Sequence, residues 1–170
     1  MGWTRTLRDS IPETFRNTFS VRMLGMLKIR LLFMCSPKVL ELSDDRCAVE
    51  LPLNGWTRNH LRSMYFGALA CGADLAGGLI AWRLIERSGR PVSLIFKDFH
   101  AEFLKRAEAA TVFTCEDGAM VKELVAKTLD TGERHDCKVT IVATVPSKLG
   151  SEPVARFQLT LSLKATALKK

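Results

Sequence analysis

The sequence has few histidines and no closely spaced cysteines, and both shortages argue against whole classes of protein. Its five cysteines are scattered, odd in number and include no C-x-x-C pair, and only three histidines accompany them. This pattern does not fit a disulfide framework and offers no zinc-ligand spacing. We therefore expect buried free thiols, a reducing, cytoplasmic location and no bound metal. The cysteines are Cys35, Cys47, Cys71, Cys115 and Cys137.

The sequence also lacks a recognisable export signal, an internal repeat and a low-complexity tract. The first thirty residues are basic, but Asp9 and Glu13 interrupt them, and no small-residue cleavage site follows an apolar core. An organelle transit peptide stays open as an alternative for a eukaryotic source. We favour an ordinary amphipathic helix.

Composition and charge describe one folded domain with a basic surface. Of the 170 residues, 47% are hydrophobic and 25% are charged, and the net charge is +7. Such a balance suits an anionic partner: nucleic acid, an acidic membrane surface or a phosphate-bearing coenzyme. A solvated basic surface with no specific partner explains it equally well. No basic-aromatic strand motif or recognition helix is present, so we expect no nucleic-acid partner.

Apolar residues recur at helical spacing near the N-terminus, with basic residues between them. They are Ile11, Phe15, Phe19, Met23, Leu24 and Leu27. A helix of this kind either lies on a membrane or packs on its own domain, and we favour packing. We therefore divide the chain into an N-terminal helical extension over residues 1–30 and a single domain over residues 31–170.

Alternation of apolar and polar residues predicts the strands. They cover residues 38–42, 47–53, 92–101, 104–115, 137–145 and 155–163. A short helix is expected over residues 117–130, with Asp117 as a candidate N-cap and Gly132 just past its end. Residues 146–153 have the composition of a loop.

A long apolar segment interrupts this strand pattern. Residues 64–82 read MYFGALACGADLAGGLIAW and contain a single charge, Asp74. The length and apolarity match a membrane-spanning helix. Three features oppose that interpretation: a central charge is costly in lipid, Gly and Ala dominate over larger apolar residues, and strands flank the segment closely. We expect instead an α+β fold in which one antiparallel sheet wraps around this helix, with no stable membrane insertion.

Three residues in and before this helix suit acyl-transfer chemistry. Gly67 lies near the helix start, where a backbone N–H and the helix dipole favour developing negative charge. Asp74 supplies a carboxylate, which is costly in an apolar helix unless it is paired or functional. Asn59, in the preceding loop, is able to orient water or a carbonyl. Taken singly, each residue also has a structural explanation, as a hydrogen-bonding group or a packing requirement.

Residues 59–78 resemble the active-site segment of the hotdog-fold thioesterase superfamily. The nearest branch is the phenylacetyl-CoA-thioesterase type, with its uncharacterised domain-of-unknown-function relatives. That branch shows Asn, then a His-Gly-Gly group, then Ala-Asp or Ala-Glu at mid-helix. Asn59, Gly67 and Asp74 match the Asn, the second Gly and the acid. Tyr65 stands where the family often has His, and Phe66 where it often has the first Gly.

The resemblance implies a hotdog fold and hydrolysis of an acyl-CoA or acyl-carrier thioester. Asp74 would act as base or nucleophile and the Gly67 N–H as oxyanion donor, with Asn59 as the polar orienter. The Tyr65 hydroxyl would replace the missing His, and Phe66 would narrow the pocket entrance. The alternative is a non-catalytic acyl-CoA-binding or lipid-binding module on the same fold, because the motif is altered at Tyr65 and Phe66.

Coenzyme A would enter as part of the substrate, and no cofactor is expected. Relatives carry pantetheine and phosphate contacts on the strands after the helix, which points to Lys97, Lys105 and Arg106. Arg58 and Arg62 flank Asn59 and are comparable candidates. Each of these side chains also has a plain interpretation as a solvated surface cation.

The resemblance further implies an oligomer. Gly67 and Asp74 are seven residues apart, or about 10 Å along a helix, too far for both to contact one thioester carbon. In the family, Asn and Gly of one subunit face the acid of the other. We therefore expect a homodimer, with a homotetramer built as a dimer of dimers as the further option.

Overall fold

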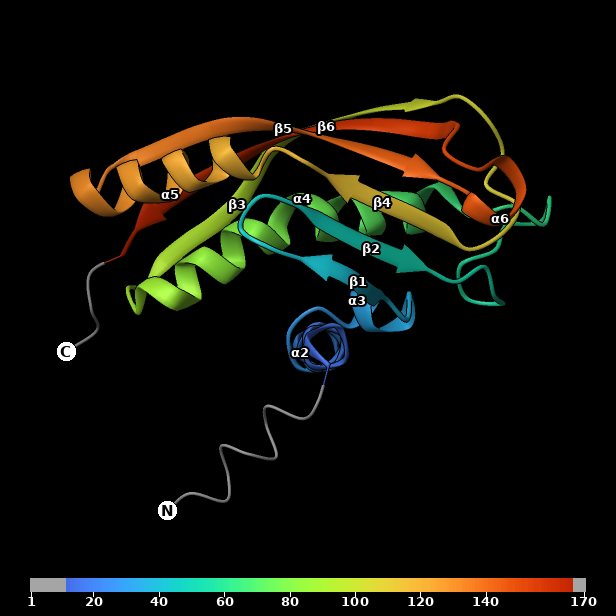
Figure 1. The fold of residues 1–170 in the computed structure, drawn as a ribbon, viewed down its shortest axis with the longest axis horizontal. Helices are drawn as coiled ribbons and strands as arrows, with labels where there is room; N and C mark the ends of the chain where they lie inside the picture. The colour runs from blue at the N-terminus through green and yellow to red at the C-terminus, as the bar shows by residue number, and fades with distance from the viewer. Residues whose placement is uncertain (1–11, 167–170) are drawn as a thin grey trace, which may run out of the picture.

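A computed structural model describes residues 12–166 as one antiparallel sheet packed on a long helix. Two short N-terminal helices precede the sheet, and one further helix and a single helical turn lie between its later strands (Figure 1). The elements are α2 (Glu13–Leu27), α3 (Arg30–Met34), β1 (Lys38–Leu42), β2 (Cys47–Leu51), α4 (Phe66–Ser88), β3 (Val92–Phe103), β4 (Thr111–Cys115), α5 (Gly118–Thr131), β5 (Arg134–Thr144), α6 (Pro146–Leu149) and β6 (Pro153–Ala165).

The sheet has six strands in the order β1-β2-β4-β5-β6-β3. β3 follows α4 directly but pairs with β6 at the far edge of the sheet. α4 therefore connects β2, near one edge, with β3 at the opposite edge. The strands therefore curve around α4, as Figure 1 shows. This is the hotdog arrangement, and it confirms the predicted fold class. β3 is left as an edge strand of 12 residues, whereas β1 at the other edge has 5.

α4 is the central helix of the domain. Its sheet-facing side is made of small and aliphatic residues, and it ends at Gly89, which has a positive φ of 64° that favours glycine. The helix is long and apolar enough to cross a membrane, yet 61% of its most apolar stretch is buried within the domain. Its packing is that of a core helix.

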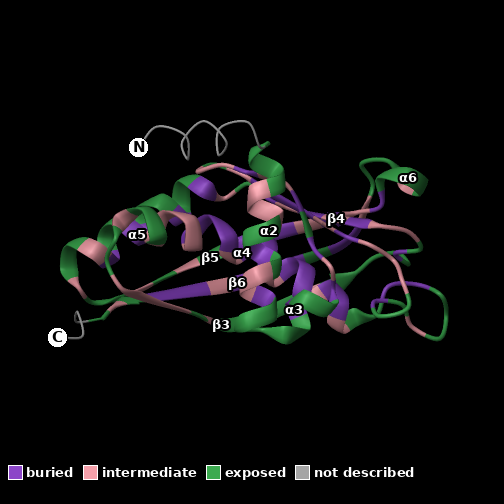
Figure 2. Cartoon of the chain, turned by 90° about the horizontal axis from the view of Figure 1, so that it is seen from below, coloured by how far each residue is buried: buried purple, intermediate pink, exposed green. Residues whose placement is uncertain are grey.

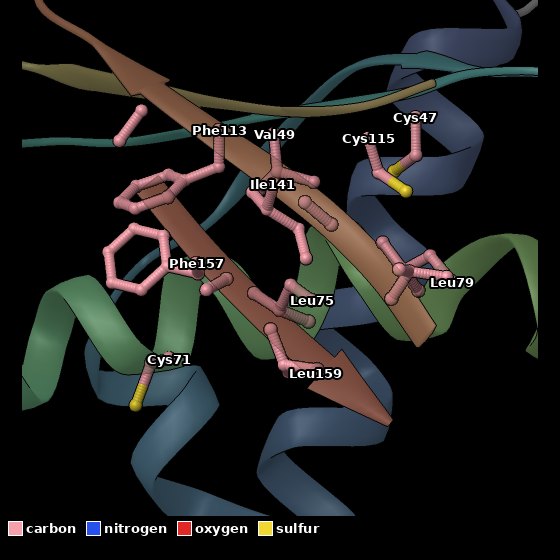
Figure 3. Packing of buried hydrophobic residues seen from close by; sticks show 14 of the residues in the cluster. Cys47, Val49, Cys71, Leu75, Leu79, Phe113, Cys115, Ile141, Phe157 and Leu159 are labelled. Atoms are coloured by element: carbon pink, nitrogen blue, oxygen red, sulfur yellow. The ribbon is translucent and has the colours of Figure 1, made fainter. Parts of the chain in front are cut away.

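The small residues of α4 let the aromatic core approach the helix backbone. Phe113 of β4 and Phe157 of β6 lie above the helix, and both are fully buried (Figure 3). A Cβ added at Gly72 would lie 2.3 Å from the Phe113 ring, well inside van der Waals contact. Glycine at this position is therefore required by packing.

We predict that Gly72→Ala destabilises the protein by about 1–3 kcal/mol, because the Phe113 ring must shift within a filled core. Ala is the better helix former, so any loss reports packing alone. Chemical denaturation measures the effect. Ala70→Gly, at a half-buried site on the same helix, is the control for helix propensity and should lose no more than about 1 kcal/mol. Equal or higher stability of Gly72→Ala would contradict this description of the core.

The N-terminal helices cover the side of α4 that faces away from the sheet. α2 is held to β1 through Thr18, whose hydroxyl accepts a hydrogen bond from Val39 N at 2.9 Å. Arg22 donates to the carbonyl of Pro37 at 2.9 Å. Val21, Gly25 and Leu32 are buried. Packing on the domain, the favoured interpretation of the sequence, is therefore what α2 does, although Figure 2 shows much of α2 and α3 exposed. Ile11 of the predicted stripe lies outside the described residues.

Several predicted boundaries were wrong. The strand expected over residues 104–115 is β4 only at Thr111–Cys115, because residues 104–106 are exposed and two of their N–H groups donate to the carbonyl of Val154. α4 runs six residues beyond the predicted end, and a helical turn, α6, interrupts the predicted loop over residues 146–153. Asp117 stands at the N-cap of α5, but its carboxylate accepts a hydrogen bond from Thr140 N of β5. Gly132, at φ 73°, ends α5 as expected.

Candidate functional site

A closely bonded loop leads into α4. The Asn54 side-chain oxygen accepts hydrogen bonds from the N–H groups of Trp56 and Thr57, at 2.8 and 3.2 Å. The Thr57 hydroxyl donates to the carbonyl of Pro52 at 2.6 Å. The backbone N–H of Tyr65 then donates to the Thr57 carbonyl at 2.8 Å. These bonds fix where the helix begins.

Asn59 organises the second half of this loop. Its side-chain oxygen accepts hydrogen bonds from Leu61 N and Ser63 N, at 2.9 and 3.1 Å. Its amide nitrogen donates to the Ser63 hydroxyl at 3.1 Å. Because the oxygen is engaged twice, any contact between Asn59 and a substrate would come from the second amide hydrogen. The structure thus gives Asn59 a loop-positioning role, the structural explanation that the sequence left open beside a catalytic one.

Gly67 is the second residue of α4 and presents its backbone N–H at the helix start. The first hydrogen bond of the helix backbone runs from Leu69 N to Tyr65 O, and no side chain within residues 12–166 caps this end. The N–H of Gly67 is therefore one of the donors that a helix leaves unpaired, aligned with the positive end of the dipole. A Cβ at Gly67 would lie 2.7 Å from the Tyr65 ring, which packs against this glycine.

Tyr65 and Phe66 form an exposed aromatic pair beside this donor. Their ring centroids are 4.7 Å apart, and the two residues are 48% and 61% exposed. Large exposed aromatic side chains beside an unpaired backbone donor are typical of a binding surface.

Asp74 lies two turns further along α4, at the border of the core. It is half-buried, and burial raises the pKa of its carboxyl from 3.8 to about 6. It borders a cavity of 240 Å³ whose other lining side chains are apolar. A carboxyl whose pKa is lifted toward neutrality in an apolar cavity has the properties of a general base.

A cysteine pair lies beside Asp74, and sequence reasoning missed it. Cys71, one turn before Asp74, contacts Cys35 at the end of α3, and this contact together with burial raises the pKa of the Cys71 thiol. All five cysteines are free thiols; the predicted burial holds for four of them, whereas Cys137 is half-buried. The scattered spacing of the cysteines carried no signal that α3 would fold against α4.

The predicted basic residues separate into two groups. Lys97 forms an ion pair with Asp136 at 2.6 Å, and Lys105 pairs with Glu152. Within residues 12–166, no ion pair involves Arg58, Arg62 or Arg106.

These three arginines belong to two loops that meet near the start of α4. The loops are joined by a hydrogen bond from Met64 N to Ala107 O at 2.8 Å. The arginines are exposed, and their loops border the same end of α4 as Gly67. In the part of the chain that the structure describes, no three His, Cys, Asp or Glu side chains gather to hold a metal ion.

Comparison with solved structures identifies proteins of the same fold. A Pseudomonas aeruginosa protein of unknown function, described as a probable thioesterase, is 22% identical, with a TM-score of 0.70 over 88% of this chain and 96% of its own. A thioesterase from the same organism is 11% identical, with a TM-score of 0.66 over 92% and 97%. A Chlorobaculum tepidum protein of unknown function is 8% identical, with a TM-score of 0.76 over 90% and 97%. At sequence identities this low, the structural similarity shows that the fold is shared.

Comparison with protein families is more specific, although curated protein sequences give no match to the chain. One family model matches residues 25–163, which begin within α2 and extend into β6. The match covers the loop before α4, the helix with Gly67 and Asp74, and the whole sheet but the end of β6. The predicted membership in a hotdog-fold family that includes relatives of unknown function is thereby confirmed: the chain belongs to the family described as Domain of unknown function (DUF4442).

Proposed function

We propose that this protein hydrolyses an acyl thioester, of coenzyme A or of an acyl carrier. The observation that carries the proposal is the pairing, on one helix, of an unpaired N–H at Gly67 with a half-buried carboxyl at Asp74 whose pKa is raised to about 6. Structural neighbours described as thioesterases support the same reaction class.

In this mechanism the Asp74 carboxylate takes a proton from water, and the resulting hydroxide attacks the thioester carbon. The carbonyl oxygen becomes an oxyanion, which the Gly67 N–H stabilises at the positive end of the α4 dipole. When the tetrahedral intermediate collapses, the C–S bond breaks and the thiolate leaves, taking a proton from Asp74. Direct attack by the Asp74 carboxylate, forming an acyl-enzyme anhydride that water then hydrolyses, is the other route that the same residues support.

The two groups act together only across a subunit interface. Along α4 they are about 10 Å apart, so one thioester cannot reach both within a single chain. β3 supports pairing with a second copy, because it is a long edge strand with exposed Ile95, Phe99 and Phe103. A homodimer joined along β3 would set Gly67 of one subunit against Asp74 of the partner subunit.

The arginines near the start of α4 would bind the anionic end of the substrate. Arg58, Arg62 and Arg106 form no ion pair within the described residues and belong to the two loops joined at Met64 and Ala107. Coenzyme A carries phosphates, for which guanidinium groups are suited donors. Lys97 and Lys105 are less suited, since each is already paired with a carboxylate.

A hydrolysis panel tests this function. Purified protein is assayed with acyl-CoAs of two to sixteen carbons, with aryl-CoAs and with an acyl-carrier thioester, and thiol release is followed. The proposal expects catalysed release from at least one of these thioesters. No release above the uncatalysed rate from any of them would overturn it.

The pH dependence gives a second, independent readout. The Asp74 base works only when ionised, and its pKa is raised to about 6. We predict that kcat/KM rises with pH, reaches half its plateau near pH 6 and is about tenfold below the plateau at pH 5. Initial rates measured between pH 4.5 and 8 provide the test. A flat profile across that range would exclude a carboxylate base of this kind.

Two observations favour a second function, a non-catalytic acyl-ligand-binding module. Tyr65 stands where relatives often have His, and its ring packs against Gly67. The side-chain oxygen of Asn59 already accepts a hydrogen bond from Leu61 N in its own loop. Tight binding of acyl-CoA without turnover of any thioester would support this alternative.

A further inference from the structure

A cavity beside Asp74, open to solvent on one side, is lined by three separate parts of the chain. One wall is α4, with Asp74, Gly78 and Trp82. The opposite wall is the α2–α3 segment, through Leu24, Ile29 and Leu32, and β3 closes the side with Leu94 and Phe96. The volume is 240 Å³. Among the described residues that line it, Asp74 is the single charged one.

Gly78 makes room for this cavity. A Cβ added there would lie 3.3 Å from the Phe96 ring and would point toward the cavity wall that β3 provides. Gly77, its neighbour, faces Ile141 and Val139 on the sheet side instead. Two glycines in one turn of a core helix therefore serve different purposes: Gly77 lets β5 approach the helix, and Gly78 leaves space in the cavity beside Phe96 of β3.

We propose that this cavity binds the acyl group of the substrate, and that the acyl group is an unbranched aliphatic chain of about eight to ten carbons. The proposal rests on the proposed function and deepens it. A methylene takes about the volume of one water molecule, ~30 Å³, so the cavity holds about eight of them, with the thioester carbon left at Asp74. A lining of apolar side chains offers nothing to pair with a polar or charged acyl group.

The α2–α3 segment would then help to determine which acyl chains the site accepts. Leu24 is held against the cavity because α2 is anchored to Val39 of β1 through Thr18 and to the carbonyl of Pro37, just before β1, through Arg22. Ile29, between the two helices, is 48% exposed and stands where a chain would enter or leave. Residue size at these positions, rather than at the catalytic groups, would set the accepted chain length.

Binding is measured apart from hydrolysis, with decanoate and S-decyl-coenzyme A, which has a thioether in place of the thioester. Trp82 lines the cavity, whereas Trp56 is 74% exposed in the loop before α4. Both probes are expected to change the tryptophan fluorescence of the wild-type protein and of Trp56→Phe. The change should be lost in Trp82→Phe.

Chain-length preference is then measured with two variants of opposite effect. Gly78→Leu adds four side-chain carbons, so the preferred acyl chain should become about four carbons shorter and kcat/KM for decanoyl-CoA should fall at least about tenfold. Leu24→Ala removes apolar volume from the opposite wall, so the preference should move to longer chains. Ala126→Leu, which adds three side-chain carbons at an exposed position of α5, should leave the preference unchanged.

The outcomes separate this inference from the proposed function. Trp82-dependent probe binding without turnover would keep the acyl site and reject hydrolysis. Turnover with no Trp82 response, or with the same chain-length preference in wild type, Gly78→Leu and Leu24→Ala, would reject the acyl site and keep hydrolysis. If Gly78→Leu fails to fold by circular dichroism, Leu24→Ala and the fluorescence measurement decide.

Discussion

Replacing Asp74 by Asn is expected to lower kcat/KM for thioester hydrolysis by at least about 100-fold, the usual contribution of a general base. Asn keeps the shape of the side chain but cannot accept the proton from water. Asp74 is half-buried, and burial is what raises the pKa of its carboxyl.

The same change is expected to stabilise the protein at neutral pH. Burial raises the pKa of Asp74 from 3.8 to about 6, so the native state holds its proton more tightly than the unfolded chain does. Stability is therefore lost as pH rises from about 4 to about 6, by at most about 3 kcal/mol at pH 7. Asp74→Asn removes this penalty, so its unfolding free energy should exceed that of wild type at pH 7 and match it near pH 4. Such an exchange of stability for activity is common at functional sites.

Denaturation at pH 4 and 7, together with the hydrolysis assay, measures both effects. Asp130→Asn is the matched control, because Asp130 is exposed on α5. It should change neither activity nor the pH dependence of stability. An Asp74→Asn protein that is as active as wild type would remove Asp74 from the mechanism. One that is less stable than wild type at pH 7 would mean that the carboxylate has a structural partner.

Placing a charge on the β3 edge is expected to abolish activity almost completely. Phe99 is 45% exposed on this edge strand, and its ring lies 5.6 Å from that of the buried Phe157. In the proposed dimer a second copy covers it. Phe99→Lys would bury an unpaired ammonium at that interface, so the protein should become monomeric. With Gly67 and Asp74 held about 10 Å apart on one helix, the monomer should retain less than about 1% of the wild-type rate.

Light scattering and the hydrolysis assay together test this prediction. Met120→Lys is the matched control, because Met120 is 46% exposed on α5, away from β3. It should leave both the oligomeric state and the rate unchanged. Wild-type protein that is monomeric yet active, or a monomeric Phe99→Lys that keeps its rate, would contradict the shared site.

Most of the fold was predictable because its patterns are local. Strands such as β5 and β6 alternate cleanly since one face of the sheet packs on α4, and α4 itself is apolar along its buried side. The prediction of a strand over residues 104–115 was wrong in its first part. The N–H groups there donate hydrogen bonds to the carbonyl of Val154, which is distant in the sequence and therefore absent from any local pattern.

The site was predictable only in part, for the same reason. Gly67 and Asp74 stood out by residue type and spacing along one helix. The loop-positioning bonds of Asn59 and the ion pairs that engage Lys97 and Lys105 depend on side-chain partners across the fold. The cavity beside Asp74 was invisible in the sequence, because its walls come from α2, α3, α4 and β3.

Subunit complementation tests the central claim that each site combines Gly67 of one subunit with Asp74 of the partner subunit. Gly67→Pro removes the N–H in the first helical turn, where Pro is tolerated, and Gly67→Ala is its control because it keeps the N–H. Gly67→Pro and Asp74→Asn should each be inactive alone. When the two are coexpressed, half of the dimers should be mixed and should contain one intact site each, so activity should return to about a quarter of that of wild type. A mixture as inactive as its two components would show that the two residues act within one chain, and would contradict the account.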